Sequence, residues 1–260
     1  MSNSLSASRP DIVARLRSAG CVFAEDETRL LLSAARTPAD LAAMVYRRVN
    51  GTPLEHILGW AEFHGLRITV EPGLFVPRRR TEFLVSHAAA LATSSAVVVD
   101  LCCGSGAVGA ALLAELPSIQ LHATDVDPAA VRCARRNIAA AGGRAYVGDL
   151  TAPLPTRLQG RVDVMAANAP YIPTDTIGLM PPEARLHEPR VALDGGADGL
   201  DVHRRIIAAA PQWLAVGGHL LIESSQDQAA HIADAMASGG LVPRIAHSDE
   251  LDTAVVIGRY

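Results

Sequence analysis

Residues Val97–Gly106 read VVVDLCCGSG: an apolar run closed by an acid, then glycines at alternate positions. Together with the next three residues, the end of this stretch fits the dinucleotide-binding pattern GxGxxG letter for letter. Glycines at this spacing allow a tight turn from a strand into a helix, where the backbone can approach a ligand closely. The stretch therefore predicts a buried strand, Ala96–Leu101, that leads through a binding loop into a helix, Gly106–Leu116.

Short apolar runs alternate with helical segments from about residue 80 to the end of the chain. This alternation is typical of a parallel α/β sheet with helices on both faces. The expected strands are Ala96–Leu101, Leu121–Thr124, Ala145–Val147, Val162–Ala167, Gly218–Glu223, Val242–His247 and Thr253–Gly258. The expected helices are Gly106–Leu116, Pro128–Ala141, Gly199–Leu214 and Gln226–Ser238, with an irregular stretch over Pro170–Asp198.

Four successive strands of this pattern end in a polar side chain, namely Asp100, Asp125, Asp149 and Asn168. In doubly wound sheets, ligands bind outside the carboxyl ends of the strands. Any one of these side chains could be a helix cap or a polar loop residue. Four such side chains at the ends of four successive strands are poorly explained in this way. We therefore expect the four side chains to line one crevice.

A different pattern precedes the sheet. Helical periodicity extends over about residues 8–50, and two short strands, Trp60–His64 and Leu66–Val70, follow as a hairpin joined at Gly65. The sequence therefore predicts an N-terminal helical domain (residues 1–58), a β-hairpin linker (59–78) and an α/β domain (79–260).

The composition excludes several classes of function. The 260 residues carry 23 Lys and Arg against 27 Asp and Glu, a net charge of −4, and only 4% are aromatic. Such a chain lacks the basic face and the stacking side chains of nucleic-acid binders, so we expect no direct nucleic-acid partner. It has no apolar run of membrane-spanning length and no apolar signal segment, so we expect a cytoplasmic protein. The cysteines form no CxxC pair and the histidines no metal-binding motif, so we expect free thiols and no metal.

The glycine loop and its strand resemble the first motif of class I S-adenosylmethionine-dependent methyltransferases. An acid just before the loop suits a sulfonium cofactor with an amino-acid tail, because Asp100 favours a cation and not a pyrophosphate. Gly104 and Gly106 would let the backbone approach this cofactor. Cys102 replaces the usual first glycine, and a small side chain is tolerated there if its φ is negative.

The acids of the next two strands complete the expected cofactor site. Asp125, about 20 residues after the loop, suits an acid that accepts both ribose hydroxyls, and we count Val126 beside it as a cofactor-binding residue. Asp149 and Leu150 are expected at the adenine edge, where a carboxylate can accept from the exocyclic amino group. A nicotinamide dinucleotide is the competing interpretation of the glycine pattern.

Asn168-Ala169-Pro170-Tyr171 resembles the (D/N)PPY motif of enzymes that methylate planar nitrogens. Such a nitrogen is a poor nucleophile because its lone pair is delocalised. Its two N–H donors can be held by the Asn168 side-chain oxygen and the Ala169 backbone oxygen, which aligns the nitrogen with the S–methyl bond. Pro170 would stiffen the turn and Tyr171 would pack against the planar group. An ordinary turn at a strand end is the alternative.

Further stretches resemble the HemK/PrmC family of protein-(glutamine-N5) methyltransferases, which act on peptide release factors. They are Pro53–Gly59, Ala61–Leu66, Val76–Arg78 with Thr81 and Glu82, Glu188–Asp201, and Gly217–Glu223 with Gln226 or Gln228. The resemblance implies a helical bundle, a hairpin linker and a Rossmann-like seven-stranded methyltransferase domain. It also implies that Phe63 and the Pro77-Arg78 turn close over the cofactor or shape a tunnel for the glutamine.

The resemblance implies methyl transfer from S-adenosylmethionine to the side-chain nitrogen of a glutamine in a protein, most specifically a release factor. We expect the protein to be a monomer. Three features depart from the family: Ala169 replaces a proline, Cys102 replaces a glycine, and Arg79 and Arg80 replace a proline and an acid. The arginines indicate either a more acidic partner surface or a solvated turn. Methylation of another protein, peptide or small-molecule amide, a DNA or RNA amino-methyltransferase, and a non-catalytic binding module remain alternatives.

Overall fold

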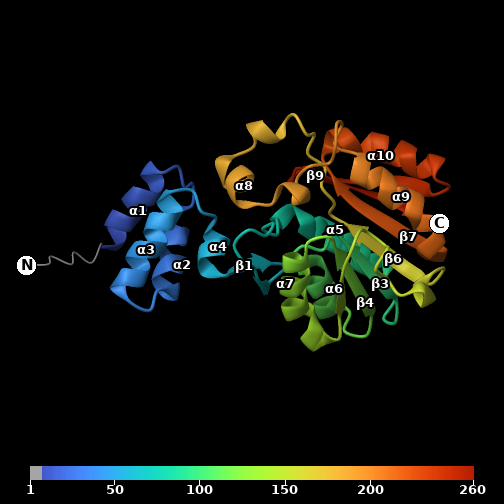
Figure 1. The fold of residues 1–260 in the computed structure, drawn as a ribbon, viewed down its shortest axis with the longest axis horizontal. Helices are drawn as coiled ribbons and strands as arrows, with labels where there is room; N and C mark the ends of the chain where they lie inside the picture. Colours follow the sequence, from blue (N-terminus) through green and yellow to red (C-terminus); the bar gives the residue numbers. More distant parts are fainter. Residues whose placement is uncertain (1–7) are drawn as a thin grey trace, which may run out of the picture.

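The computed structural model describes residues 8–260 (Figure 1). The chain begins with four helices, α1 (Arg9–Ser18), α2 (Ala24–Ala34), α3 (Pro38–Val49) and α4 (Leu54–Leu58). They bury a small apolar core of their own, formed by Ile12, Leu16, Cys21, Ala24, Leu31, Val45 and Ile57. In Figure 1 they lie together at one end of the molecule. Helices are thus present where the periodicity predicts them. The division into domains stays a prediction. Residues 1–7 of the predicted helical domain lie outside the described residues.

A hairpin follows, in which β1 (Trp60–Phe63) and β2 (Leu66–Thr69) pair antiparallel. Its two turn residues, His64 and Gly65, have φ values of 52° and 71°. Two consecutive positive φ angles are typical of the type I′ turn, whose twist matches that of the strands. Phe63 points into the core beneath the hairpin and is fully buried.

Seven strands form one sheet in the order β5-β4-β3-β6-β7-β9-β8. The strands are β3 (Val97–Leu101), β4 (Gln120–Asp125), β5 (Arg144–Val147), β6 (Val162–Ala167), β7 (Leu214–Ser224), β8 (Val242–Ser248) and β9 (Thr253–Arg259). Strands β3 to β7 are parallel, whereas β9 is antiparallel to both β7 and β8. The chain winds outward in opposite directions from β3 and β6, so the ligand crevice is expected between their carboxyl ends.

Helices cover both faces of the sheet (Figure 1). One face carries α5 (Glu82–Leu91), α6 (Ala107–Glu115) and α7 (Pro128–Ile138), and the other α9 (Asp201–Trp213) and α10 (Gln226–Ser238). The short α8 (Pro182–His187) and five 3-10 turns lie in the connections: η1 (Arg79–Thr81), η2 (Ala139–Ala141), η3 (Thr156–Leu158), η4 (Ile177–Leu179) and η5 (Arg190–Ala192). Strand β3 is buried along its whole length, which is why all its residues except Asp100 are apolar. Among residues 8–260, no helix has the length and apolarity that crossing a membrane requires.

The largest difference from the predicted elements is α5, a helix of 10 residues in a segment where no element is predicted. A second difference is at the junction of α9 and β7. The pattern predicts a helix to Leu214 and a strand from Gly218, but α9 ends at Trp213 and β7 begins at once. Leu214 pairs with Val162 of β6, and the register then shifts before the regular pairing resumes. A β-bulge of this kind depends on the neighbouring strand, so hydrophobic periodicity does not reveal it.

Candidate active site

The carboxyl ends of the central strands open into one cavity of about 270 Å³. Its lining includes all but one of the residues predicted for the site: Phe63, Arg78, Asp100, Cys102, Gly104, Asp125, Val126, Asp149, Leu150, Asn168, Ala169, Pro170 and Tyr171. The four polar strand ends therefore share one crevice, as their spacing predicts. The exception is Gly106. A Cβ atom at this position would lie only 3.0 Å from the Cβ of Ala134 in α7. Gly106 thus allows the loop to pack against α7.

Backbone conformation in the glycine loop corrects one expectation. Cys102 has a φ of 55°, so it adopts the left-handed conformation and not the negative φ under which a side chain would be tolerated without strain. Gly104 and Gly106 are also left-handed, with φ of 53° and 78°. A non-glycine residue in this region costs about 1–2 kcal/mol. Leu150, which also lines the cavity, has a φ of 47°. Strained residues of this kind concentrate at binding sites.

The loop is poorly suited to a pyrophosphate. The N–H groups of Cys103, Gly104 and Gly106 donate to the Thr124 backbone oxygen, the Asp125 carboxylate and the Cys103 backbone oxygen, so they are not free to hold phosphate oxygens. Four carboxylates, Asp100, Asp125, Asp127 and Asp149, line the same cavity, together with three arginines. Asp100 and Asp125 lie at the loop itself, and because like charges repel, they favour a cation over a pyrophosphate there.

The carboxylate of Asp100 is buried at the floor of the cavity. It accepts a hydrogen bond from the Gly109 N–H at 3.0 Å. Burial, the largest effect, raises its pKa to about 7; the Gly109 hydrogen bond lowers it and the nearby Asp125 raises it. A ligand cation beside Asp100 would stabilise the ionised carboxylate, and the same interaction would bind the ligand.

Asp125 supports the loop and still has acceptor capacity. Its two oxygens accept from the N–H groups of Gly104 (2.8 Å) and Asp127 (2.9 Å). A carboxylate offers about four lone-pair directions, so one on each oxygen remains for a pair of hydroxyl donors. Asp149 lies at the exposed edge of the cavity, where its carboxylate pairs with Arg205 of α9.

The side chain of Asn168 is oriented by a threonine from a distant part of the chain. Its Nδ2 donates to Oγ1 of Thr81, in η1, at 3.0 Å. The amide nitrogen is thereby engaged, so the carbonyl oxygen is the end of Asn168 that can accept from a ligand in the cavity. The sequence contains Thr81 within a resembling motif, but no local pattern indicates that it contacts Asn168.

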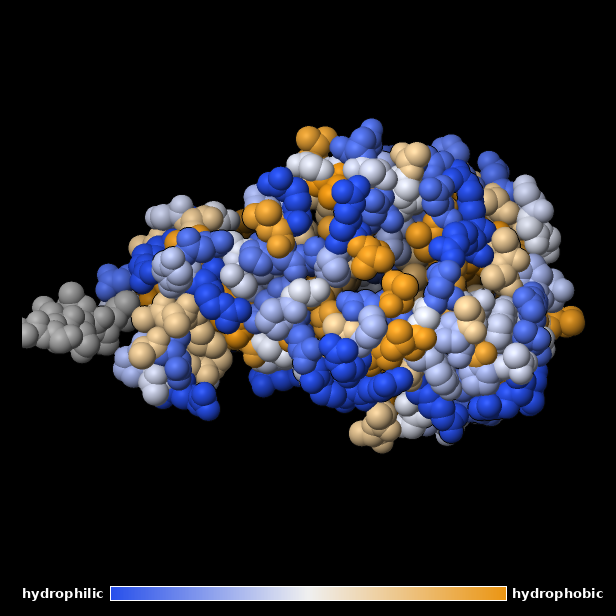
Figure 2. Space-filling model, in the orientation of Figure 1, coloured by the Kyte–Doolittle hydropathy of each residue, from blue (hydrophilic) through white to orange (hydrophobic). Residues whose placement is uncertain are grey.

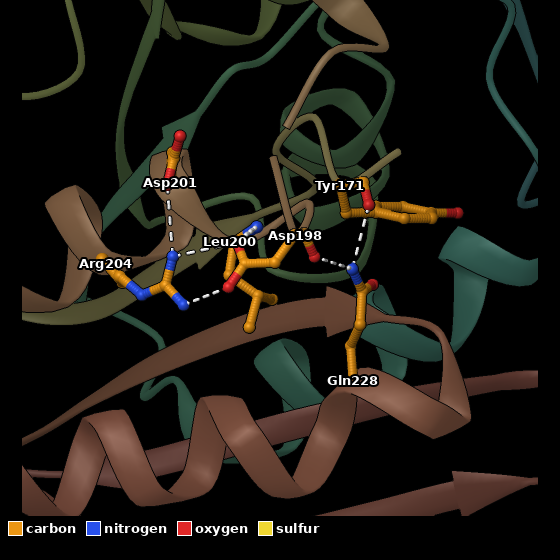
Figure 3. A network of polar contacts seen from close by, with 6 residues as sticks. All are labelled: Tyr171, Asp198, Leu200, Asp201, Arg204 and Gln228. Atoms are coloured by element: carbon orange, nitrogen blue, oxygen red, sulfur yellow. Dashed lines mark hydrogen bonds and ion pairs between the residues drawn. The ribbon is translucent and has the colours of Figure 1, made fainter. Parts of the chain in front are cut away.

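The Tyr171 backbone is held by a side chain of α10. Gln228 of α10 donates from Nε2 to the backbone oxygens of Tyr171 (3.0 Å) and Asp198 (3.3 Å), as Figure 3 shows. Arg204 in turn binds the Asp198 side chain, which also accepts from the Leu200 N–H. The resembling stretch contains two glutamines, Gln226 and Gln228. Gln228 is the one that anchors the loop after β6.

The three consecutive arginines point in different directions, so the solvated-turn interpretation holds for one of them. Arg79 is 79% exposed. Arg78 pairs with the buried Glu188 and stacks on the ring of Phe75. Arg80 donates to the Tyr171 hydroxyl at 2.7 Å.

Several residues of the site were not predicted from the sequence. The cavity is also lined by Leu74 and Phe75 from the linker and by Met180, Pro189, Val191, Ala192 and Leu193 from the segment after β6. Both segments are irregular, so only their place in the resembling motifs could have indicated them. Within the described residues, no cluster of His, Cys, Asp and Glu could hold a metal ion.

Comparison with known proteins identifies the family. Residues 65–177 match the model of the methyltransferase small domain family. The chain is 42% identical over 197 residues to the release factor glutamine methyltransferase of Geobacter sulfurreducens, covering 74% of this chain and 68% of that relative. With the enzyme of the same name from Bradyrhizobium diazoefficiens it shares 35% identity, covering 92% and 88% of the two chains. The chain belongs to the release factor glutamine methyltransferase family.

This membership confirms the predicted family and a methyltransferase activity. Solved structures support the fold. A methyltransferase from Pyrococcus furiosus has a TM-score of 0.55 at 17% identity, covering 75% of this chain and 89% of that one. A ribosomal protein L11 methylase from Lactobacillus delbrueckii has a TM-score of 0.51 at 16% identity, covering 70% and 80%. The predicted class I methyltransferase fold is therefore confirmed.

Proposed function

We propose that this chain transfers a methyl group from S-adenosylmethionine to the side-chain amide nitrogen of a glutamine in a peptide chain release factor. The observation that carries this proposal is the orientation of Asn168. Thr81 engages its nitrogen, which leaves its oxygen as an acceptor in a cavity lined by carboxylates.

The lining suits the cofactor at three places. Asp100 is the carboxylate for its cationic end, Asp125 has free acceptor positions for two ribose hydroxyls, and Asp149 with Leu150 and Val126 forms the expected adenine edge. When bound, S-adenosylmethionine supplies a methyl group on a positively charged sulfur, which an otherwise weak nucleophile can attack.

The other residues of the site act on the substrate amide. The Asn168 side-chain oxygen and the Ala169 backbone oxygen are two acceptors on adjacent residues, and both residues line the cavity. An amide NH₂ group has two donors, so two acceptors fix its orientation and favour localisation of its lone pair. The ring of Tyr171, whose hydroxyl is held by Arg80, forms a wall of the same cavity.

We propose a protein substrate because the named relatives modify release factors. A nucleic-acid amino group would fit the same chemistry, but the net charge of −4 weighs against it. We also propose that the protein acts as a monomer. We propose that it consists of an N-terminal helical domain (residues 1–58), a hairpin linker (59–78) and a methyltransferase domain (79–260).

Two substitutions test the proposal, one expected to lower turnover and the other to lower cofactor affinity. In Asn168→Ala, we expect methyl transfer to a purified release factor, followed by mass spectrometry of the glutamine peptide, to fall at least about 100-fold. Calorimetry should give nearly unchanged S-adenosylmethionine affinity. In Asp125→Ala, the affinity itself should fall, because the ribose acceptor and the support of the Gly104 loop are both lost. Near-normal turnover in Asn168→Ala would refute the role of that amide.

A further inference from the structure

A nearly buried arginine joins the N-terminal helices to a distant part of the chain, and the proposed chemistry does not use it. The side chain of Arg48, in α3, is 10% exposed. Its Nε and Nη2 donate to the two carboxylate oxygens of Glu27, in α2, at 2.6 and 3.1 Å. Its Nη1 donates to the carboxylate of Glu183, in α8, and to the Thr52 backbone oxygen at 3.3 Å. The planar guanidinium has donors on separate edges, so one arginine holds both acids.

Glu183 belongs to a strap, residues 177–193, that forms part of the cavity wall. The strap residues that line the cavity are Met180, Pro189, Val191, Ala192 and Leu193. Among the six residues of α8, all of which the structure describes, Ala184 alone is buried. Leu179 and Leu186 are 85% and 67% exposed, and Figure 2 shows hydrophobic side chains at the surface over α8 and its neighbouring loops. So short a helix is not stable by itself, so the strap depends on other segments for its position.

Both acids of the strap are bound by arginines from outside it. Arg78 of the linker pairs with Glu188, which also accepts from the Val76 N–H at 3.2 Å. Arg48 pairs with Glu183, although the two residues are 135 positions apart in the sequence. Figure 1 shows α8 on the side of the sheet that faces the N-terminal helices. The strap is therefore fastened at two points, one of them supplied by the N-terminal helices.

A second contact of the N-terminal helices also reaches the cavity wall. His56, in α4, is buried, and its Nε2 donates to the Leu74 backbone oxygen at 2.9 Å. Leu74 lines the cavity from the linker. The Arg47 guanidinium donates in turn to the His56 backbone oxygen at 3.3 Å. The N-terminal helices thus support the wall at the linker as well as at the strap.

We propose that Arg48, acting through Glu183, is a positioning residue by which the N-terminal helices fix the cavity wall along which the substrate glutamine enters. This inference rests on the proposed function, because the position of the strap matters to a substrate only if the cavity receives a glutamine side chain. It gives the N-terminal helices a part in substrate binding, although none of them carries a residue of the amide site.

The acceptors for the substrate amide are held by contacts separate from the strap. Thr81 orients the Asn168 side chain, and Gln228 holds the Tyr171 backbone. Neither of these contacts involves a residue of the strap. A loosened strap should therefore weaken the ground state and the transition state of the bound substrate equally. Such a loss of uniform binding raises KM and leaves kcat unchanged.

Glu183→Ala tests the link at saturating S-adenosylmethionine. Alanine is the best helix former, and the Glu183 side chain is 44% exposed, so the variant removes the ion pair without weakening α8. Arg48 keeps Glu27 as its partner, so no buried charge is left unpaired. The KM for a purified release factor should rise about threefold to tenfold, the effect of one partly exposed charged hydrogen bond. The kcat, and the cofactor affinity by calorimetry, should stay within about twofold of wild type.

Arg48→Lys and the double variant Arg48→Lys/Glu183→Ala show whether the two side chains act as a pair. Lysine keeps the charge beside Glu27, but its compact ammonium cannot hold two carboxylates in one fixed geometry. The KM should rise in Arg48→Lys, and the double variant should rise by less than the product of the two single effects. Glu25→Ala is the matched control, because Glu25 also lies in the first turn of a helix and pairs with an arginine, Arg17, at the surface. It should behave as wild type.

The outcomes separate this inference from the proposed function. If wild type does not methylate a release-factor glutamine, the proposed function fails and this inference with it. If wild type does so and Glu183→Ala keeps the wild-type KM, the proposed function stands and the positioning role is wrong. Independent effects in the double variant would also overturn the role, because Arg48 would then not act through Glu183. A lowered kcat at unchanged KM would overturn it too, since the effect would then lie on the amide acceptors.

Discussion

Glu223, near the end of β7, is a carboxylate that is only 1% exposed. Replacing it by glutamine should make the protein more stable at alkaline pH. Burial raises the pKa of Glu223 from 4.5 to about 7. A folded-state pKa above the unfolded value means that the unfolded chain binds fewer protons in this window, so wild-type stability falls as the pH rises from about 4.5 to about 7. One pKa unit corresponds to about 1.4 kcal/mol, so the whole rise is worth about 3 kcal/mol. Glutamine does not ionise, so this loss disappears in the variant.

The measurement is urea unfolding of wild type and Glu223→Gln at pH 5 and pH 8, followed by tryptophan fluorescence. Trp213 is buried at the end of α9, immediately before the strand that carries Glu223, so it reports on this part of the sheet. The free energy of unfolding of the variant, relative to wild type, should increase by about 2 to 3 kcal/mol between the two pH values. Glu250→Gln, on the surface, should show no such change. A difference that stays constant with pH would refute the assignment of a desolvated, ionisable Glu223.

Two further predictions concern the glycine loop. Cys102→Gly should raise the free energy of unfolding by about 1 kcal/mol, because relief of the left-handed strain at φ of 55° exceeds the entropy that glycine adds to the unfolded chain. Thermal unfolding that is unchanged or lower in this variant would contradict the strain. Gly106→Ala should cost at least about 2 kcal/mol, because its Cβ would meet Ala134 at 3.0 Å, whereas Gly104→Ala, with open space around it, should cost about 1 kcal/mol. Equal losses in urea unfolding would show that packing against α7 is not the reason for Gly106.

Much of the site could be predicted from the sequence, because its acids follow directly on buried strands. Val97–Val99 are apolar because β3 is covered on both faces, and the acid that follows them, Asp100, lies near the end of the strand. The carboxyl ends of parallel strands lie at one edge, so Asp100, Asp125 and Asn168 had to meet. These inferences depend only on neighbours along the chain and on the geometry of any parallel sheet.

The tertiary structure alone decided the orientations. Asn168 and Thr81 are 87 residues apart, and Arg80 and Tyr171 are 91 apart, so no local periodicity relates them. The left-handed conformation of Cys102 arises from the loop that joins β3 to α6. The order of residues sets which chemical groups are available at the site. The partners that only folding brings within hydrogen-bond distance set the direction in which each group donates or accepts.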